Sequence, residues 1–250
     1  MIRHVEQSPI VTLVGDGGMG TSRVAERVVE HLSGAGWQIS IVDLAAAEGS
    51  TETSLSEEPD QSVAGLGLVW IDNALEATPF ALELIARLRK GPAGRLLVTS
   101  RCTMGVAGER VVRVGPITDA GAAARLFVHA ASAAGSKTRL DTTHTADIDA
   151  ICNELDRWPL AIEMAARRTA VQSPAELLAA LRAHTLSSVL DGEHADGCTP
   201  TIAGVVTATI ATLNDEPLQA AERLAALADW WTIEEGTELL PTRALDVVSA

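Results

Sequence analysis

A glycine-rich turn at residues 15–22, GDGGMGTS, holds the groups of this chain best suited to chemistry. It follows an apolar run, and glycines in such a turn let backbone N–H groups come close to a phosphate. A hydroxyl at its end is the usual ligand for the magnesium that accompanies a nucleotide. The residues that we expect to bind a nucleotide here are Gly15, Gly17, Gly18, Gly20, Thr21 and Ser22.

The turn departs from the phosphate-loop pattern G-x-x-x-x-G-K-[ST] at one position, where Thr21 stands in place of lysine. A hydrogen bond to a charged group contributes about 1.5–3 kcal/mol, so its loss predicts roughly tenfold to hundredfold weaker binding of a triphosphate. The rate of triphosphate hydrolysis should fall by a larger factor than the affinity. The turn therefore predicts a nucleotide site with weak or absent hydrolysis.

Length and composition indicate one large domain or two small ones with an aliphatic core. Of the 250 residues, 47% are hydrophobic and none is tyrosine. The formal net charge of −14 argues against nucleic-acid binding through this chain, because such binding neutralises phosphates with Lys and Arg. The N-terminus shows no apolar signal-peptide run and no apolar stretch approaches membrane-spanning length, so we expect a cytoplasmic protein.

Short apolar runs alternate with helical segments in the first half of the chain, as in a parallel sheet covered on both faces. We expect strands at residues 10–14, 38–42, 66–71, 95–99 and 110–114, with a helix at 22–32. After residue 116 the periodicity is helical, and we expect helices at 119–134, 147–156, 160–169 and 174–183. The pattern predicts an α/β domain followed by helices.

Two polar segments interrupt the pattern of apolar runs and helical segments. The acidic segment 48–62 predicts a surface loop, and the segment 191–200, with two glycines and a proline, predicts a domain boundary. We expect an α/β nucleotide-binding domain at 1–116, a helical domain at 117–190 and a third unit at 200–250.

Six segments in order resemble the signal-transduction ATPases with numerous domains, the STAND class, and more narrowly the NB-ARC-type module of LuxR- and SARP-type bacterial regulators. They are VTLVGDGGMGTSRVA at 11–25, IVDLA at 41–45, LVWIDNAL at 68–75, LLVTSR at 96–101, RWPLAIEMAARR at 157–168 and ALADWWTIEE at 226–235. The ordered set carries the resemblance, since each motif alone is weak. It implies a P-loop NTPase-like parallel sheet followed by a helical bundle and a partial winged-helix unit.

The resemblance also implies a ligand and a role. ATP or ADP would lie between the sheet and the helical domain, with Ser22 and Asp72 on magnesium, Arg101 at the terminal phosphate and Pro159 against the base. The chain would act as a regulatory switch in signal transduction or transcriptional control. Its partners would be nucleotide and other protein domains or subunits, and neither nucleic acid nor membrane.

The chain departs from the family pattern at several places. Thr21 replaces the lysine, and Arg157 with Trp158 replaces the usual Gly-Leu before Pro159, which changes size and charge beside the expected base pocket. The family has an adenine-contacting segment upstream of the phosphate loop, and we expect it to be missing here because only about ten residues precede the first strand. We expect a fragment or a degenerate remnant that ends inside the winged-helix unit.

Two other functions fit parts of the sequence. The spacing Gly15-x-Gly17-x-x-Gly20, with Asp43 at the end of the second strand, matches the dinucleotide-binding fingerprint and predicts an NAD-linked oxidoreductase. Alternatively, the loss of the lysine fits an interaction module or scaffold that no longer binds nucleotide. Asp72 could also serve as a turn acceptor, and Arg101 as a surface ion-pair partner.

No other catalytic or metal site stands out in the sequence. The six histidines are scattered, and Cys102, Cys152 and Cys198 lack the spacing of a zinc site or a disulfide framework. The serines lack the G-x-S-x-G context of a nucleophile. Catalytic residues therefore remain unassigned, and we expect no metal apart from a nucleotide-borne magnesium.

Overall fold

The computed structural model describes residues 1–44, 67–74, 77–90, 94–135, 145–183, 186–190 and 202–210, with the positions 218, 219 and 223. The chain divides into two compact units, Met1–Leu190 and Asp191–Ala250. The expected acidic loop at 48–62, the boundary at 191–200, the 226–235 motif and most of the expected winged-helix unit lie outside the described residues.

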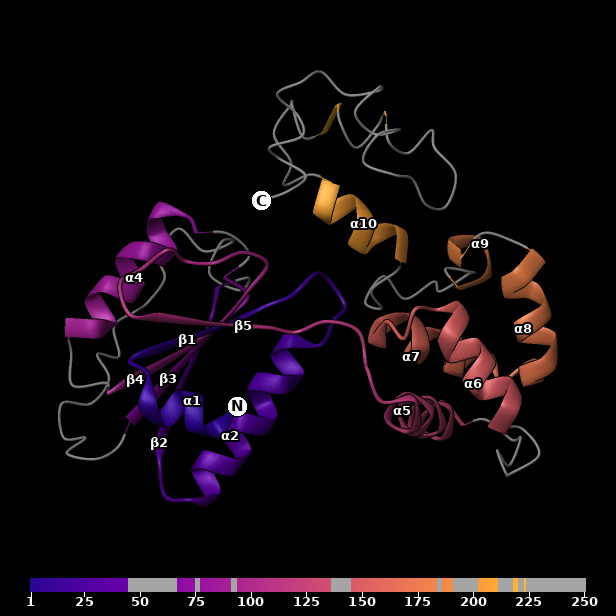
Figure 1. Cartoon of the computed structure of the whole chain (residues 1–250), viewed down its shortest axis with the longest axis horizontal. Coiled ribbons are helices and arrows are strands. Elements are labelled where there is room, and N and C mark those ends of the chain that lie inside the picture. Colours follow the sequence, from indigo (N-terminus) through magenta and orange to yellow (C-terminus); the bar gives the residue numbers. More distant parts are fainter. Residues whose placement is uncertain are drawn as a thin grey trace. The chain divides into compact units, whose positions relative to one another are not determined.

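Five parallel strands form one sheet in the order β2-β3-β4-β1-β5 (Figure 1). They are β1 (Ile10–Val14), β2 (Gln38–Asp43), β3 (Gly67–Asp72), β4 (Arg95–Ser100) and β5 (Glu109–Arg113). The register pairs Val14 with Ser100 on one side and with Arg113 on the other, and it pairs Asp43 with Asp72. The predicted α/β class and all five strands are confirmed, with strand ends that differ by one residue at most.

Helices cover both faces of this sheet, because the three inner strands are apolar on both sides. One face packs against α1 (Ile2–Gln7) and α2 (Thr21–Gly34), through a core that includes Val5, Val28 and Leu32. The other face packs against α4 (Pro79–Lys90), through Leu84 and Ile85. Figure 1 shows α2 and α4 on opposite sides of the strands. Sequence reasoning did not place α1 or α4.

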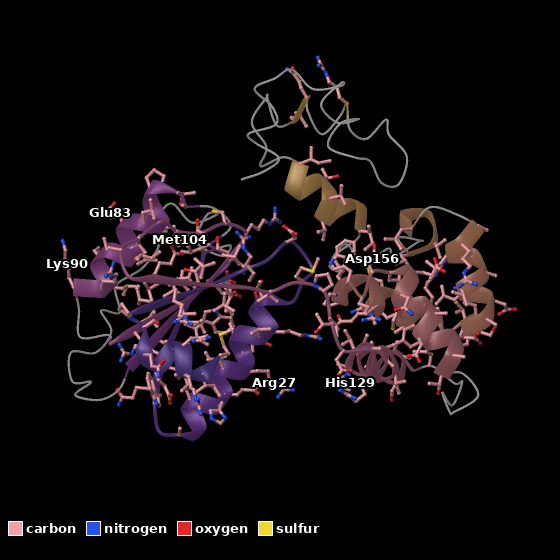
Figure 2. The ribbon with its side chains drawn as sticks, in the orientation of Figure 1. Arg27, Glu83, Lys90, Met104, His129 and Asp156 are labelled. Carbon is pink, nitrogen blue, oxygen red and sulfur yellow. The ribbon has the colours of Figure 1, made fainter. Side chains whose placement is uncertain are left out.

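The connection from β4 to β5 is held by one carboxylate. Glu109 accepts hydrogen bonds from the backbone N–H groups of Met104, at 2.9 Å, and Gly105, at 2.8 Å. Met104, labelled in Figure 2, is 3% exposed and packs into the core on the α4 side of the sheet. The connection is thus held both by the burial of the Met104 side chain and by the hydrogen bonds from its backbone to Glu109.

A helical part follows the sheet within the first unit. It comprises α5 (Ala120–Ala133), α6 (Thr145–Glu154), α7 (Pro159–Arg168), α8 (Pro174–Ala183) and α9 (Leu186–Leu190). Asp119 caps α5 by accepting from the N–H of Ala122 at 2.9 Å. Ser173 and Glu176 form a capping box at α8, and these hydrogen bonds hold the pKa of Glu176 below its usual value.

The helix expected at 147–156 corresponds to α6, and the predicted C-terminal end of this helix is wrong. It stops at Glu154, because Asp156 and Arg157 adopt left-handed backbone conformations, with φ of 48° and 53°. The family motif carries glycine at the second of these positions, and glycine adopts such a conformation without strain.

In the second unit, the structure describes α10 (Ile202–Ile210). None of the helices in the described residues is long and apolar enough to span a membrane.

Phe127 anchors the helical part, since its side chain on α5 is fully buried. We expect Phe127→Ala to lower the free energy of unfolding of the chain by about 3–5 kcal/mol, through lost burial and the cavity left behind. Urea unfolding followed by circular dichroism measures this. The neighbouring Val128→Ala, at a side chain with 39% exposure, should cost under about 1 kcal/mol, and equal losses would contradict this account.

Cys152 on α6 should resist alkylation. Burial raises the pKa of its thiol to about 11, so roughly one molecule in a thousand carries the reactive thiolate at pH 8. Cys102 is exposed. We expect iodoacetamide at pH 8 to label Cys102 within minutes and Cys152 only after denaturation, as read by peptide mass spectrometry. Rapid labelling of Cys152 in the folded chain would show that α6 opens locally.

Candidate functional site

The carboxyl ends of the strands bring the expected site residues to one edge of the sheet, as the ends of parallel strands do. β1 runs into the glycine turn, which leads directly into α2. The N–H of Gly15 donates to the carbonyl of Ser100 at the end of β4, at 3.1 Å. The turn is therefore fixed at its base to the neighbouring strand.

Asp72, at the end of β3, is the centre of the polar contacts at this edge. Its Oδ1 accepts a hydrogen bond from the hydroxyl of Ser22 at 2.8 Å and another from the hydroxyl of Thr99. Ser22 lies in the first turn of α2, and Thr99, which is 2% exposed, lies in β4. Two residues expected to share a magnesium ion thus lie within hydrogen-bond distance of each other.

Asn73 extends this arrangement to the edge strand. Its φ of 57° is left-handed, and its side-chain amide donates to Asp43 Oδ1 at 3.0 Å. Its backbone N–H donates to Thr99 Oγ1 at 3.0 Å. Neither Thr99 nor Asn73 was named as a site residue from the sequence. Both stand at the ends of strand motifs, Asn73 in LVWIDN and Thr99 in LLVTS, and this position was the signal that could have found them.

The glycines of the turn meet different constraints. A Cβ on Gly15 would lie 2.6 Å from the carbonyl oxygen of Val114, so only glycine fits beside β5. Gly20 has φ of 83° at the N-cap of α2, a conformation that disfavours other residues. Thr21 is the first residue of α2 and presents a methyl group and a hydroxyl where the pattern calls for an ammonium group.

The other two expected site residues, Arg101 and Pro159, are sequence neighbours of residues that contact this turn. Arg101 directly follows Ser100, whose carbonyl accepts from the turn. Pro159 is the first residue of α7, between two residues that contact the turn. The indole N–H of Trp158 donates to the carbonyl of Gly17 at 3.1 Å, and the N–H of Leu160 donates to that of Gly18 at 3.2 Å.

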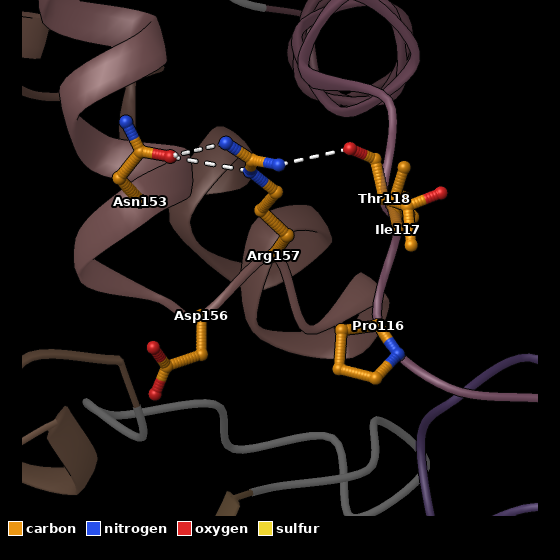
Figure 3. Close-up of a pocket in the computed structure, with 6 residues that line it drawn as sticks. All are labelled: Pro116, Ile117, Thr118, Asn153, Asp156 and Arg157. Carbon is orange, nitrogen blue, oxygen red and sulfur yellow. Dashed lines mark hydrogen bonds between the residues drawn. The ribbon is translucent and has the colours of Figure 1, made fainter.

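A pocket of about 440 Å³ lies next to these contacts, between the segment after β5 and the turn from α6 to α7 (Figure 3). The guanidinium of Arg157 crosses it, donating to the carbonyl of Thr118 at 2.9 Å and to Asn153 Oδ1 at 3.0 Å. Arg157, which sequence reasoning counted as a departure from the family pattern, therefore braces the two walls. The lining residues are Pro116, Ile117, Thr118, Asn153, Asp156 and Arg157.

The strand order argues against dinucleotide binding. In the dinucleotide-binding fold, the first strand lies beside the second, so the acid at the end of the second strand reaches the ribose. Here β3 and β4 separate β1 from β2, which places Asp43 three strand spacings, roughly 14 Å, from the end of β1. The NAD interpretation is wrong in this respect, and Asp43 instead accepts a hydrogen bond from Asn73.

Within the described part of the chain, no group of three or more His, Cys, Asp or Glu side chains could hold a metal ion. This leaves the oxygen atoms of Ser22 and Asp72 as the candidate ligands that the sequence indicated, and such oxygen donors suit magnesium.

Sequence comparison finds relatives in Mycobacterium tuberculosis. "Uncharacterized protein Rv0894" is 30% identical over 198 residues, which cover 72% of this chain and 50% of that protein. "Putative HTH-type transcriptional regulator Rv0890c" is 31% identical over 189 residues, covering 68% of this chain and 21% of that protein. The chain thus spans about half the length of Rv0894 and less of Rv0890c. No protein-family model matches the chain.

Structure comparison confirms the fold. PCH-2 of C. elegans matches with a TM-score of 0.51 and 14% identity, over 76% of this chain and 62% of that one. A STAND protein with a tetratricopeptide repeat sensor, PH0952 from Pyrococcus horikoshii, matches at a TM-score of 0.40 and 13% identity, over 99% of this chain and 37% of that one. That second score is too low to carry an argument. Together with the strand order and the glycine turn, the first match shows a P-loop NTPase-like fold.

Asp72 should contribute to stability through its two hydroxyl donors. Asp72→Ala leaves the buried hydroxyl of Thr99 without this acceptor, and we expect a loss of about 1–3 kcal/mol in the free energy of unfolding. Asp72→Asn keeps an acceptor oxygen in the same place and should cost under about 1 kcal/mol. Urea unfolding of both variants separates them, and equal costs would show that the hydroxyl contacts contribute little.

Proposed function

We propose that the chain is a nucleotide-binding regulatory module that binds ATP or ADP with magnesium and hydrolyses ATP slowly or not at all. The observation that carries the proposal is the 2.8 Å hydrogen bond from Ser22 to Asp72, at the end of the glycine turn. It brings the hydroxyl that follows the turn to the carboxylate of β3, two strands away from β1. A metal bound to the phosphates of a nucleotide in the turn would meet both oxygens.

Each candidate site residue has a role in this proposal. Gly17, Gly18 and Gly20 would present backbone N–H groups to the phosphates. Gly15, whose N–H donates to the carbonyl of Ser100, would hold the start of the turn against β4, and Thr21 would end the turn at the first residue of α2. Ser22 and Asp72 would hold magnesium, whose charge is balanced by the carboxylate and the phosphates. Arg101 would lie at the terminal phosphate and Pro159 at the base.

The wider role rests on the sequence relatives. Rv0890c is named as a putative HTH-type transcriptional regulator, and the ordered motifs resemble the STAND class. We therefore place the chain among STAND-type modules of LuxR- or SARP-type regulators, acting in the cytoplasm on other protein domains or subunits. With a net charge of −14, it would contact neither nucleic acid nor membrane directly.

A nucleotide-free scaffold is the second candidate. Thr21 favours it, because the residue at the start of α2 brings no positive charge to the turn. In this case the glycine turn would serve only the packing of β1, α2 and α7.

Calorimetric titration of the purified chain with ATP, ADP and NAD, each with magnesium, tests the proposal directly. We expect heat of binding with ATP or ADP and none with NAD, because the strand order places Asp43 away from the turn. Asp72→Asn is the matched variant, since it should keep the fold while weakening the magnesium-dependent part of binding. If neither ATP nor ADP gave heat of binding, the result would favour the nucleotide-free scaffold.

Restoring the lysine should strengthen binding. We expect Thr21→Lys to improve the binding of ATP by about 1.5–3 kcal/mol, because the ammonium group would neutralise phosphate oxygens. The control Thr21→Met adds similar length without charge and should bring no gain. Calorimetry of the three proteins at one salt concentration gives the comparison, and an equal affinity for Lys and Met variants would contradict the phosphate-loop geometry.

A further inference from the structure

Two carbonyl groups of the glycine turn are fixed from outside by the start of α7. Gly17 accepts from the indole Nε1–H of Trp158 at 3.1 Å, and Gly18 accepts from the N–H of Leu160 at 3.2 Å. In a planar trans peptide the carbonyl and the next N–H point in opposite directions. The N–H groups of Gly18 and Met19 therefore point away from α7.

The two bonds from α7 act on peptide groups within the glycine turn. The N–H of Met19 donates to the carbonyl of Asp16 at 3.1 Å, which closes the turn on itself. The bond from Leu160 thus supports this closure, and the bond from Trp158 sets the direction of the Gly18 N–H. Both bonds therefore act on the backbone shape of the turn, which is the proposed phosphate-binding segment.

The contact with α7 is close as well as polar. Gly18 has φ of 78°, and a Cβ at this position would lie 2.7 Å from the Cβ of Leu160 and 2.8 Å from Nε1 of Trp158. Arg23, one residue after Ser22, also forms an ion pair with Glu163 of α7. Because Arg23 is 66% exposed, this pair adds little by itself, and the indole and amide bonds carry the contact.

Trp158 is itself held in place by the neighbouring turn. The N–H of Ile117 donates to the carbonyl of Arg157 at 3.1 Å, and the N–H of Trp158 donates to the carbonyl of Leu155 at 2.9 Å. The indole is thus presented from a fixed backbone rather than from a free loop.

We propose that Trp158 is a positioning residue for phosphate binding, which holds the glycine turn in its binding shape from outside in a chain that lacks the lysine. This inference rests on the proposed nucleotide site. It makes the affinity of the turn for phosphate depend on the helical part of the same unit.

Amide hydrogen exchange of the ligand-free chain tests the mechanical part of the inference. Trp158→Phe keeps an aromatic ring and removes the N–H donor to the carbonyl of Gly17, which lies inside the turn that the Met19–Asp16 hydrogen bond closes. We therefore expect the Met19 amide to exchange about twofold to tenfold faster. Trp37→Phe is the matched control, at another partly buried tryptophan that packs against the core beside α2, and it should leave Met19 unchanged. Unchanged exchange of Met19 in Trp158→Phe overturns the inference.

Ligand binding tests the functional part. With magnesium present, Trp158→Phe should bind pyrophosphate about twofold to tenfold more weakly and bind adenosine as the wild type does. A parallel loss for both ligands would mean a merely structural role and would overturn the inference. If the wild type binds neither ATP nor pyrophosphate, the proposed function fails, whereas the exchange data still decide whether Trp158 holds the turn.

A measurement on the wild type covers the case in which the variant does not fold. In nitrogen-15 spectra, the indole N–H resonance of Trp158 should shift when pyrophosphate is added, and that of Trp37 should stay in place. A ligand that binds without moving the Trp158 resonance would contradict a link between the indole and the phosphate-binding surface.

Discussion

The hydrogen bond between Ser22 and Asp72 is the contact on which the candidate site depends. It joins the start of α2 to the end of β3 across the intervening strand β4, and Thr99 of β4 donates to the same carboxylate oxygen. Three elements are thereby fixed to one atom. Because Thr99 is buried and Asn73 bonds to it in turn, the carboxylate is held in place before any ligand arrives.

The glycine turn that precedes Ser22 is also held by the start of α7, through hydrogen bonds to the carbonyl groups of Gly17 and Gly18. In a phosphate loop with lysine, the ammonium group contacts the β- and γ-phosphates of the ligand. In this chain the supports are backbone and indole donors from residues about 140 positions further along the sequence. The proposed binding surface would therefore be shared between the sheet and the helical part of one compact unit.

Sequence patterns were sufficient for the strands, and the family resemblance implied the approach of Ser22 to Asp72. The inner strands are continuous apolar runs, which is the pattern of strands buried on both faces of a parallel sheet. The strand order was beyond reach, because it depends on long-range pairing, and it was the order that removed Asp43 from the turn. The role of Trp158 was equally hidden, since the motif comparison treated it as a departure.

Helices α1 and α4 were not predicted from the sequence, and the two cases differ. α1 has six residues, too few to show a helical period, and one of them, Val5, is buried. α4 begins with proline, which suits a first helical position, and its buried residues Ala81, Leu84 and Ile85 have helical spacing, so the sequence does contain the signals of this helix. The left-handed conformation of Arg157 could not be predicted from its own residue type, since only the glycine of the family motif at this position indicates it.

The lack of room at Gly18 bears on how such turns change over evolutionary time. Any side chain at this position would collide with α7, so selection for a stably folded unit would retain the glycine even in a descendant that never meets a nucleotide. The glycines and the lysine of a phosphate loop are then under separate pressures, one from packing and one from ligand charge. A chain that has lost the lysine and kept the glycines is the outcome that such separate pressures would produce.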